Sequence, residues 1–170
     1  MTRLILRDGT RENSFTPVDS VDALSLVDGA ILVPLEVIDT ALSDGRNTPI
    51  GLVVGNAIPE TAIHPYLNRV SLIAITFPAF SDGRGLSLAM RLRRAGFTGT
   101  LRARGPVIAD QFRDLLACGF DEIELPDGVA ERQPEAQWRT AQEVVTLHYQ
   151  QSYDHGSSIL QKRLAARSKG

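Results

Sequence analysis

Two stretches of the sequence carry residue types that are suited to holding an anion. The first contains Ser81, Asp82, Gly83, Arg84 and Gly85 in succession. The two glycines let backbone N–H groups approach a ligand closely, and a helix that starts here favours negative charge at its N-terminus. Arg84 adds a bidentate grip on phosphate, sulfate, sulfite or carboxylate. The same residues are also typical of a tight turn in which Ser81 or Asp82 caps the helix and Arg84 pairs with a carboxylate.

The second stretch contains Arg102 and Arg104, followed by Gly105. Side chains alternate along a strand, so these two arginines share one face of the strand predicted at 100–104. Two guanidinium groups near the mouth of a covered sheet need anionic partners, because unpaired buried charge is costly. The partner is either an anionic ligand or one of the structural carboxylates Asp82, Glu122 and Glu124.

A third group of candidates lies near the start of the helix predicted from Pro106. Asp110 and Gln111 are close enough to its N-terminus to reach the same mouth. In an enzyme, Asp82 or Asp110 would act as acid or base, and Gln111 would bind the ligand. No metal site is predicted, because a single cysteine excludes a multi-cysteine zinc site. The histidines lack metal-ligand spacing and stand at positions 64, 148 and 155.

Strands alternating with helices position these candidates. Apolar runs predict strands at 50–54 and 70–77, and two further strands are predicted at 100–104 and 122–125. Helical spacing predicts helices at 84–95, 106–118 and 135–149. The pairs Gly96-Phe97 and Gly119-Phe120 each follow a helix and precede a strand, 23 residues apart. This repeat predicts an α/β fold of about four βα units with a mainly parallel sheet. Such units form either half of an eight-stranded, TIM-like barrel or a small open sheet.

The N-terminal part of the chain has a less regular pattern. A strand at 4–6 ends at an Asp8-Gly9 turn, residues 10–22 are predicted as loop, and a strand at 31–33 precedes a helix at 34–41. We therefore expect one α/β domain over 1–150, with an N-terminal segment (1–49), βα units (50–150) and a basic tail (151–170). A half-barrel leaves two open strand edges, which predicts a homodimer.

Composition excludes several classes of protein. The net charge of -2 removes the basic excess that is typical of nucleic-acid-binding proteins. No apolar run approaches the roughly 18 residues of a membrane helix, and the N-terminal apolar stretch is too short for a secretory signal. We therefore expect a cytoplasmic protein that binds neither nucleic acid nor membrane.

Four blocks together resemble one protein family. They are Phe77-Pro78-x-Phe80-x-Asp82-Gly83-Arg84-Gly85, Gly99-x-Leu101-Arg102-Ala103-x-Gly105-x-Val107, Asp110-Gln111 and Cys118-Gly119-Phe120-Asp121. In this order they resemble the DUF934 family, bacterial proteins of unknown function that are commonly labelled oxidoreductases of sulfite reduction. The chain departs from the family pattern at Arg104, where a small or apolar residue is usual, and at Pro106, where an acid is usual. The resemblance implies sulfur assimilation, with sulfite reductase or phosphoadenylyl-sulfate reductase as partner.

Residues and resemblance together predict an accessory protein of sulfite reduction that binds a small oxyanion (sulfite, sulfate or phosphate) or a pathway enzyme. No flavin, nicotinamide, haem or iron–sulfur motif is present in the sequence, so no cofactor is predicted and the question of enzymatic activity stays open. One alternative is a barrel-like enzyme that clamps an anionic substrate with Arg84 and Arg102. The other is a structural subunit, which internal ion pairing of the Asp82–Arg84 turn would favour.

Overall fold

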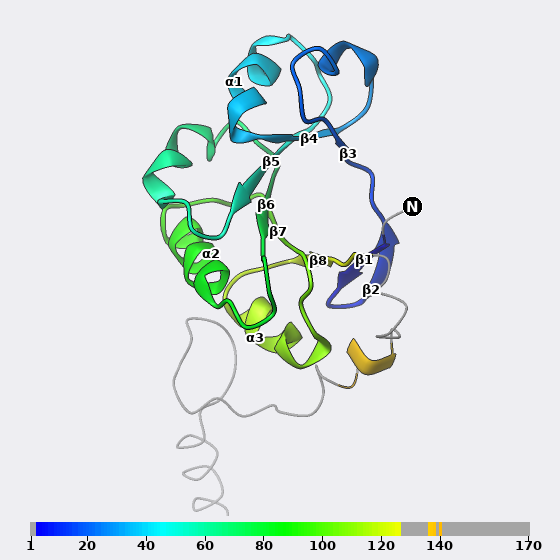
Figure 1. The fold of residues 1–170 in the computed structure, drawn as a ribbon, viewed down its shortest axis with the longest axis vertical. Helices are drawn as coiled ribbons and strands as arrows, with labels where there is room; N and C mark the ends of the chain where they lie inside the picture. The colour runs from blue at the N-terminus through cyan, green and yellow to red at the C-terminus, as the bar shows by residue number, and fades with distance from the viewer. Residues whose placement is uncertain (1–2, 127–135, 139, 141–170) are drawn as a thin grey trace, which may run out of the picture.

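A computed structural model describes residues 3–126, 136–138 and 140, and shows one eight-stranded sheet in the order β2-β1-β8-β7-β6-β5-β4-β3. Neighbouring strands are parallel from β3 through to β8, whereas β1 is antiparallel to both β2 and β8. The sheet curls into an incomplete ring (Figure 1). The strands are β1 (Arg3–Leu6), β2 (Gly9–Glu12), β3 (Thr16–Pro17), β4 (Ile31–Pro34), β5 (Ile50–Gly55), β6 (Leu72–Thr76), β7 (Thr100–Arg104) and β8 (Glu122–Glu124).

The helices lie on the outside of this ring (Figure 1). Strand residues that point outward, such as Ile73, Leu101 and Ile123, are buried together with Leu88 and Phe112 from the helices. The main apolar core therefore fills the layer between the convex face of the sheet and its helices. The helices are α1 (Leu35–Ser43), α2 (Arg84–Arg94) and α3 (Phe112–Ala117), with short 3-10 helices at Leu24–Leu26, Glu60–Ala62, His64–Tyr66 and Ala109–Gln111.

The concave face of the sheet has a different character. Leu32, Leu72 and Ala74 form a small buried apolar cluster there, against which Phe15 and Val53 pack. The rest of the concave face carries buried charge, in the form of one arginine on β7 and two glutamates on β8. The link at residues 13–15 joins the two edge strands β2 and β3 across the opening of the ring (Figure 1). The concave face of the sheet thus has an apolar part and a charged part that lie next to each other.

The repeated helix ends take the form that the sequence predicts. Gly96 and Gly119 have φ of 94° and 101°, a region that favours glycine. The N–H of Phe97 donates to the carbonyl of Leu92 over 3.1 Å, and Phe120 repeats this bond at the end of α3. Both ends are Schellman motifs, which stop a helix and turn the chain into the next strand.

The mainly parallel, curled α/β sheet is confirmed, but its strand count exceeds the four expected units. The segment predicted as loop at 10–22 includes most of β2 and all of β3. Both are polar edge strands with exposed residues, so they lack the alternating apolar pattern that reveals a strand. Gly9, with φ of 150°, forms the expected turn between β1 and β2.

Some expectations are altered or lie beyond the described residues. The helix expected at 106–118 is a 3-10 turn (Ala109–Gln111) followed by α3, because Ile108 is extended. Most of the helix predicted at 135–149 and all of the tail at 151–170 lie outside the described residues. The domain boundaries and the homodimer stay predictions. Among the described helices, none has the length and apolar character needed to cross a bilayer.

Candidate functional site

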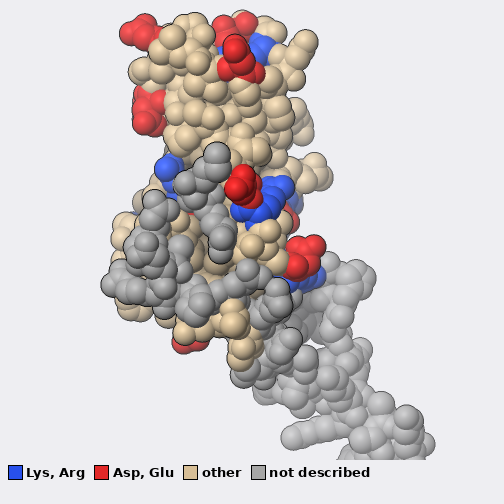
Figure 2. All heavy atoms as spheres, turned by 90° about the vertical axis from the view of Figure 1, so that its right-hand side faces the viewer, with Lys and Arg blue, Asp and Glu red and all other residues tan. Residues whose placement is uncertain are grey.

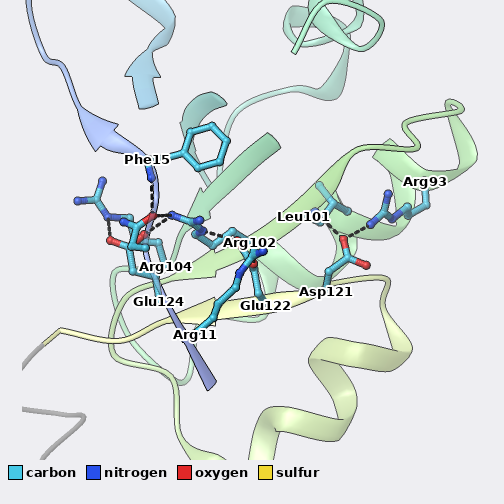
Figure 3. Close-up of polar contacts among 10 residues, drawn as sticks. Arg11, Phe15, Arg93, Leu101, Arg102, Arg104, Asp121, Glu122 and Glu124 are labelled. Carbon is cyan, nitrogen blue, oxygen red and sulfur yellow. Dashed lines mark hydrogen bonds and ion pairs between the residues drawn. The ribbon is translucent and has the colours of Figure 1, made fainter. Parts of the chain in front are cut away.

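Arg102 is the centre of a buried ionic cluster on the concave face of the sheet. Its side chain is 0% exposed. The Nε donates to Glu122 Oε1 over 2.7 Å, and Nη1 donates to Glu124 Oε2 over 2.9 Å (Figure 3). The register of β7 on β8 places Arg102 opposite Glu122 and Arg104 opposite Glu124. The parallel pairing therefore brings the alternating arginines and glutamates of two strands together.

Two further arginines complete the cluster. Arg104 Nε lies 3.2 Å from Glu124 Oε1, and Arg11 on β2 pairs with Glu122. Each buried carboxylate thus serves two guanidinium groups. Within the part of the chain that the structure describes, this cluster of three arginines and two glutamates has an excess of one positive charge.

The cluster reaches the surface at the opening of the ring. Arg11 is half-exposed, and Arg104 is 36% exposed. Figure 2 views the molecule from the right-hand side of Figure 1, and shows basic and acidic side chains next to one another at mid-height among mostly uncharged residues. Arg102, Glu122 and Glu124 are therefore buried, whereas Arg11 and Arg104 are in contact with solvent.

The link between β2 and β3 covers Arg102. Asn13 Oδ1 accepts from Arg102 Nη1 over 3.1 Å and also from the backbone N–H of Phe15 over 3.0 Å. The Phe15 ring lies over the guanidinium, with its centroid 5.6 Å from Cζ (Figure 3). This distance is within the range of a cation–π interaction. Arg102 is thus coupled to the conformation of the link.

One nitrogen of the Arg102 guanidinium has no hydrogen-bond acceptor among the described residues. Its Nη2 is buried and has no hydrogen-bond partner among the residues that the structure describes. A buried charged donor without an acceptor costs free energy, and a hydrogen bond from a charged group is stronger than a neutral one. The cluster can therefore offer one strong N–H donor to a ligand oxygen.

The turn at residues 81–85 is satisfied internally. Arg84 Nη2 donates to Asp82 Oδ2 over 2.6 Å, and Arg84 Nε donates to Asp82 Oδ1 over 2.9 Å. The Arg84 backbone N–H also donates to Asp82 Oδ1, over 3.2 Å, at the start of α2. The carboxylate of Asp82 thus occupies the position at the helix N-terminus where an external anion was expected. This is the structural alternative as far as the ion pair of Arg84 with Asp82 is concerned, whereas the N-cap position of α2 belongs to Gly83 and has no side-chain cap.

The same contacts perturb the ionisation of the pair. The hydrogen bond from Arg84 is the largest cause that holds the pKa of Asp82 well below its usual range, and the amide of Asn56 is the second. Asp82 in turn raises the pKa of Arg84. Asn56 follows β5 and is buried. Its amide is near enough to lower the pKa of Asp82, but among the described residues its Nδ2 has no acceptor in normal hydrogen-bond geometry. Sequence reasoning missed Asn56, although a polar residue directly after a buried strand was a usable signal.

Two of the predicted ligand-binding glycines have a packing role. A Cβ at Gly85 would lie 2.4 Å from the Phe77 ring, and one at Gly105 would lie 2.3 Å from the Phe77 carbonyl oxygen. Gly105 also has φ of 131°, which strains any other residue. Gly83 has open space around it. Close packing against Phe77 thus accounts for Gly85 and Gly105 without a ligand.

The other predicted site residues are Gln111, Ser81 and Asp110. Gln111 Nε2 donates to the carbonyl of Phe80 over 2.6 Å, and its Oε1 accepts from the N–H of Ile108 over 3.3 Å. Gln111 therefore positions the loop, whereas Ser81 and Asp110 are exposed. Among the described residues, Arg84 pairs with Asp82 whereas Arg102 pairs with Glu122 and Glu124, so the two predicted clamps have separate partners. A ligand-binding or catalytic role for these residues stays a prediction.

Three residues of the ionic cluster were not foreseen. Arg11, Asn13 and Phe15 lie on β2 and its link to β3, in the segment predicted to be mostly loop. Their contribution depends on the antiparallel pairing of β1 with β8, which brings the N-terminal hairpin beside Glu122 and Glu124. No local sequence signal reports such a long-range pairing.

Metal and thiol chemistry find no support among these residues. No group of three histidine, cysteine or acidic side chains suited to a metal ion occurs in the described part of the chain. Burial raises the pKa of the Cys118 thiol, and the Asp114 carboxylate adds to this effect. A raised pKa lowers the thiolate fraction, so Cys118 is a poor nucleophile.

Comparison with known proteins identifies the family. The model of a family described as "Bacterial protein of unknown function (DUF934)" matches residues 51–160, which is well over half of the chain. No curated protein matches the chain. The matched residues extend from the second residue of β5 to beyond β8, and include Arg102, Arg104, Glu122 and Glu124. The chain thus belongs to the DUF934 family.

Proposed function

We propose that this chain is an accessory protein of sulfite reduction that binds a small oxyanion at the ionic cluster of Arg11, Arg102, Arg104, Glu122 and Glu124. The observation that carries the proposal is the buried Nη2 of Arg102, which has no acceptor in the described structure. A ligand oxygen would complete the hydrogen bonds of this group. Native proteins leave few buried polar groups without a partner, and each of them calls for an explanation.

The charge of the cluster supports the same ligand class. Three arginines face two glutamates, so an added anion of one negative charge would balance the cluster. Burial strengthens this preference, because electrostatic interactions are larger where the effective dielectric constant is low. Planar guanidinium groups also match the geometry of oxyanions.

The assignment to sulfite reduction rests on the family. The four sequence blocks described above resemble the DUF934 family, whose members carry that label, and the family match covers the strands that bear the cluster. A binding role is favoured over acid–base catalysis by Asp82. Because Arg84 and Asn56 hold the pKa of Asp82 low, its carboxylate is a weak base near neutral pH.

Titration calorimetry with sulfite, sulfate and phosphate tests the binding site. Arg104→Gln should weaken oxyanion binding about tenfold, which corresponds to about 1.4 kcal/mol. Arg91→Gln is the matched control, because Arg91 is an exposed residue of α2 that pairs with Glu60 over 2.6 Å. Arg84→Gln tests whether the anion binds at the turn of residues 81–85 instead. Absence of binding to the unmodified protein, or a larger loss in Arg84→Gln than in Arg104→Gln, would contradict the proposed site.

Gene deletion tests the pathway. A strain that lacks the protein should grow poorly on sulfate and normally on cysteine, because cysteine enters after sulfite reduction. Complementation with the unmodified gene should restore growth on sulfate. Equal growth of the deletion strain on both sulfur sources would refute the assignment to sulfite reduction and leave the binding site to be judged by calorimetry.

Docking of a pathway enzyme is a second candidate, and one observation favours it. Phe80 is 53% exposed although its loop is held from within by Gln111 and by the Asp82–Arg84 pair. An exposed aromatic side chain on a fixed loop is a suitable anchor for a protein partner. Phe80→Ser should reduce co-sedimentation with sulfite reductase, whereas Leu26→Ser, at an exposed apolar residue elsewhere, should not. Equal co-sedimentation of both variants would contradict this candidate.

A further inference from the structure

The ionic cluster borders directly on apolar surface. The register of β6 on β7 places Ala74 opposite Arg102. Ala74 belongs to the small apolar cluster with Leu32 and Leu72, and Phe15 packs on it from the link. The Phe15 ring therefore contacts the apolar cluster and also lies over the guanidinium of Arg102. On this side of Arg102, the described side chains are apolar and offer no hydrogen bonds.

Such surroundings discriminate between anions by charge. Removing an ion from water costs free energy that rises with the square of its charge, and an apolar wall returns none of it. The cluster itself has an excess of one positive charge, counted over its described members. A monovalent anion balances this excess, whereas a divalent anion would leave one negative charge in apolar surroundings.

On the basis of the proposed function, we propose that the site selects monovalent oxyanions over divalent ones, and that Phe15 is the residue that determines this selectivity. Phe15 contributes by excluding water from the guanidinium. Its backbone N–H and Arg102 Nη1 share Asn13 Oδ1 as acceptor, so the position of the ring is tied to the hydrogen bonds of Arg102. For a sulfur oxyanion, the ligand would be hydrogen sulfite, and sulfate would be rejected.

Nitrate and sulfate are suitable probes, because they differ in charge and neither titrates near neutral pH. In calorimetry at constant ionic strength, the unmodified protein should bind nitrate at least about tenfold more tightly than sulfate, or about 1.4 kcal/mol. Phe15→Ala should reduce this ratio to about two, because water then reaches the guanidinium. Phe15→Leu keeps an apolar cover and should retain most of the ratio.

Sulfite supplies an independent readout on the unmodified protein. Total sulfite should bind more tightly at about pH 6 than at about pH 8, because the monovalent form predominates at the lower pH. Nitrate binding should not change over the same interval. This comparison needs no variant, so it decides the charge selectivity even if Phe15→Ala does not fold, in which case Phe15→Leu against the unmodified protein tests the side chain.

The outcomes separate the two proposals. Absence of binding for every anion would refute the proposed function itself. Binding of sulfate as tightly as nitrate would leave the oxyanion site in place and overturn the selectivity. A nitrate-to-sulfate ratio that Phe15→Ala leaves unchanged, in a variant with an unaltered circular dichroism spectrum, would overturn the role of Phe15.

Discussion

Replacement of Arg102 with methionine is the most direct test of how the ionic cluster contributes to stability. The change removes the charge that Glu122 and Glu124 share, at distances of 2.7 and 2.9 Å. Breaking a buried ion pair by removing one partner costs about 3–5 kcal/mol. Glu122 keeps Arg11 and Glu124 keeps Arg104, so we expect the lower end, about 3 kcal/mol. Methionine fills a similar volume, which keeps the cavity contribution small.

Urea denaturation followed by circular dichroism measures this loss. The midpoint should fall with an unchanged m-value, and the melting temperature should drop by roughly 6–12 °C. Arg91→Met is the matched control, because Arg91 pairs with Glu60 over 2.6 Å on an exposed helix face. An exposed pair contributes about 0–1 kcal/mol. A loss for Arg102→Met as small as that of the control would refute the buried, energetically coupled cluster.

Three further predictions concern the elements around the site. Gly85→Ala should destabilise the protein by about 1–3 kcal/mol in urea titrations, because its Cβ would lie 2.4 Å from the Phe77 ring, whereas Gly83→Ala meets nothing within 4 Å and should change little. Arg93→Gln should cost about 1.5–3 kcal/mol in the same assay, because its guanidinium donates to three backbone carbonyls and one carboxylate. Asp82 has a lowered pKa, so its stabilising effect is complete above the unfolded value of about 4 and fades as the pH falls below it. Asp82→Asn should therefore flatten the acid limb of the pH–stability profile, and an unchanged limb would contradict the assigned ion pair.

The strands that the sequence predicts well are those buried on both faces. The apolar runs at 50–54 and 70–77 mark β5 and β6 to within a residue or two, because continuous apolar residues bounded by glycine or proline have few other interpretations. The segment predicted at 100–104 coincides with β7. The strands at 9–12 and 16–17 were not predictable in this way. Their residues are mostly polar and exposed, and they form only because the neighbouring strands offer unpaired backbone groups.

The candidate site was predictable in composition but not in arrangement. The sequence predicts Glu122 and Glu124 among the structural partners of the arginines, and in the structure they pair with Arg102 and Arg104. What the sequence does not contain is the register of β7 on β8, since a shift by one residue would turn every charged side chain to the other face. The turn at 81–85 leaves two alternatives open in the sequence, in which Arg84 binds either a ligand or a carboxylate of the protein. The structure shows that Asp82 is such a carboxylate.

The location of Arg11, Asn13 and Phe15 has a consequence for how the family should be compared. The family match begins at residue 51, yet these three residues complete the surroundings of Arg102 from the N-terminal hairpin and its link. The hairpin is held by the antiparallel pairing of Leu4–Leu6 with Glu122–Glu124, so it is part of the same sheet. Strands β5 to β8 alone would leave Glu122 without Arg11 and Arg102 without its aromatic cover. The proposed anion site therefore depends on the whole curled sheet, including the segment that the family match does not reach.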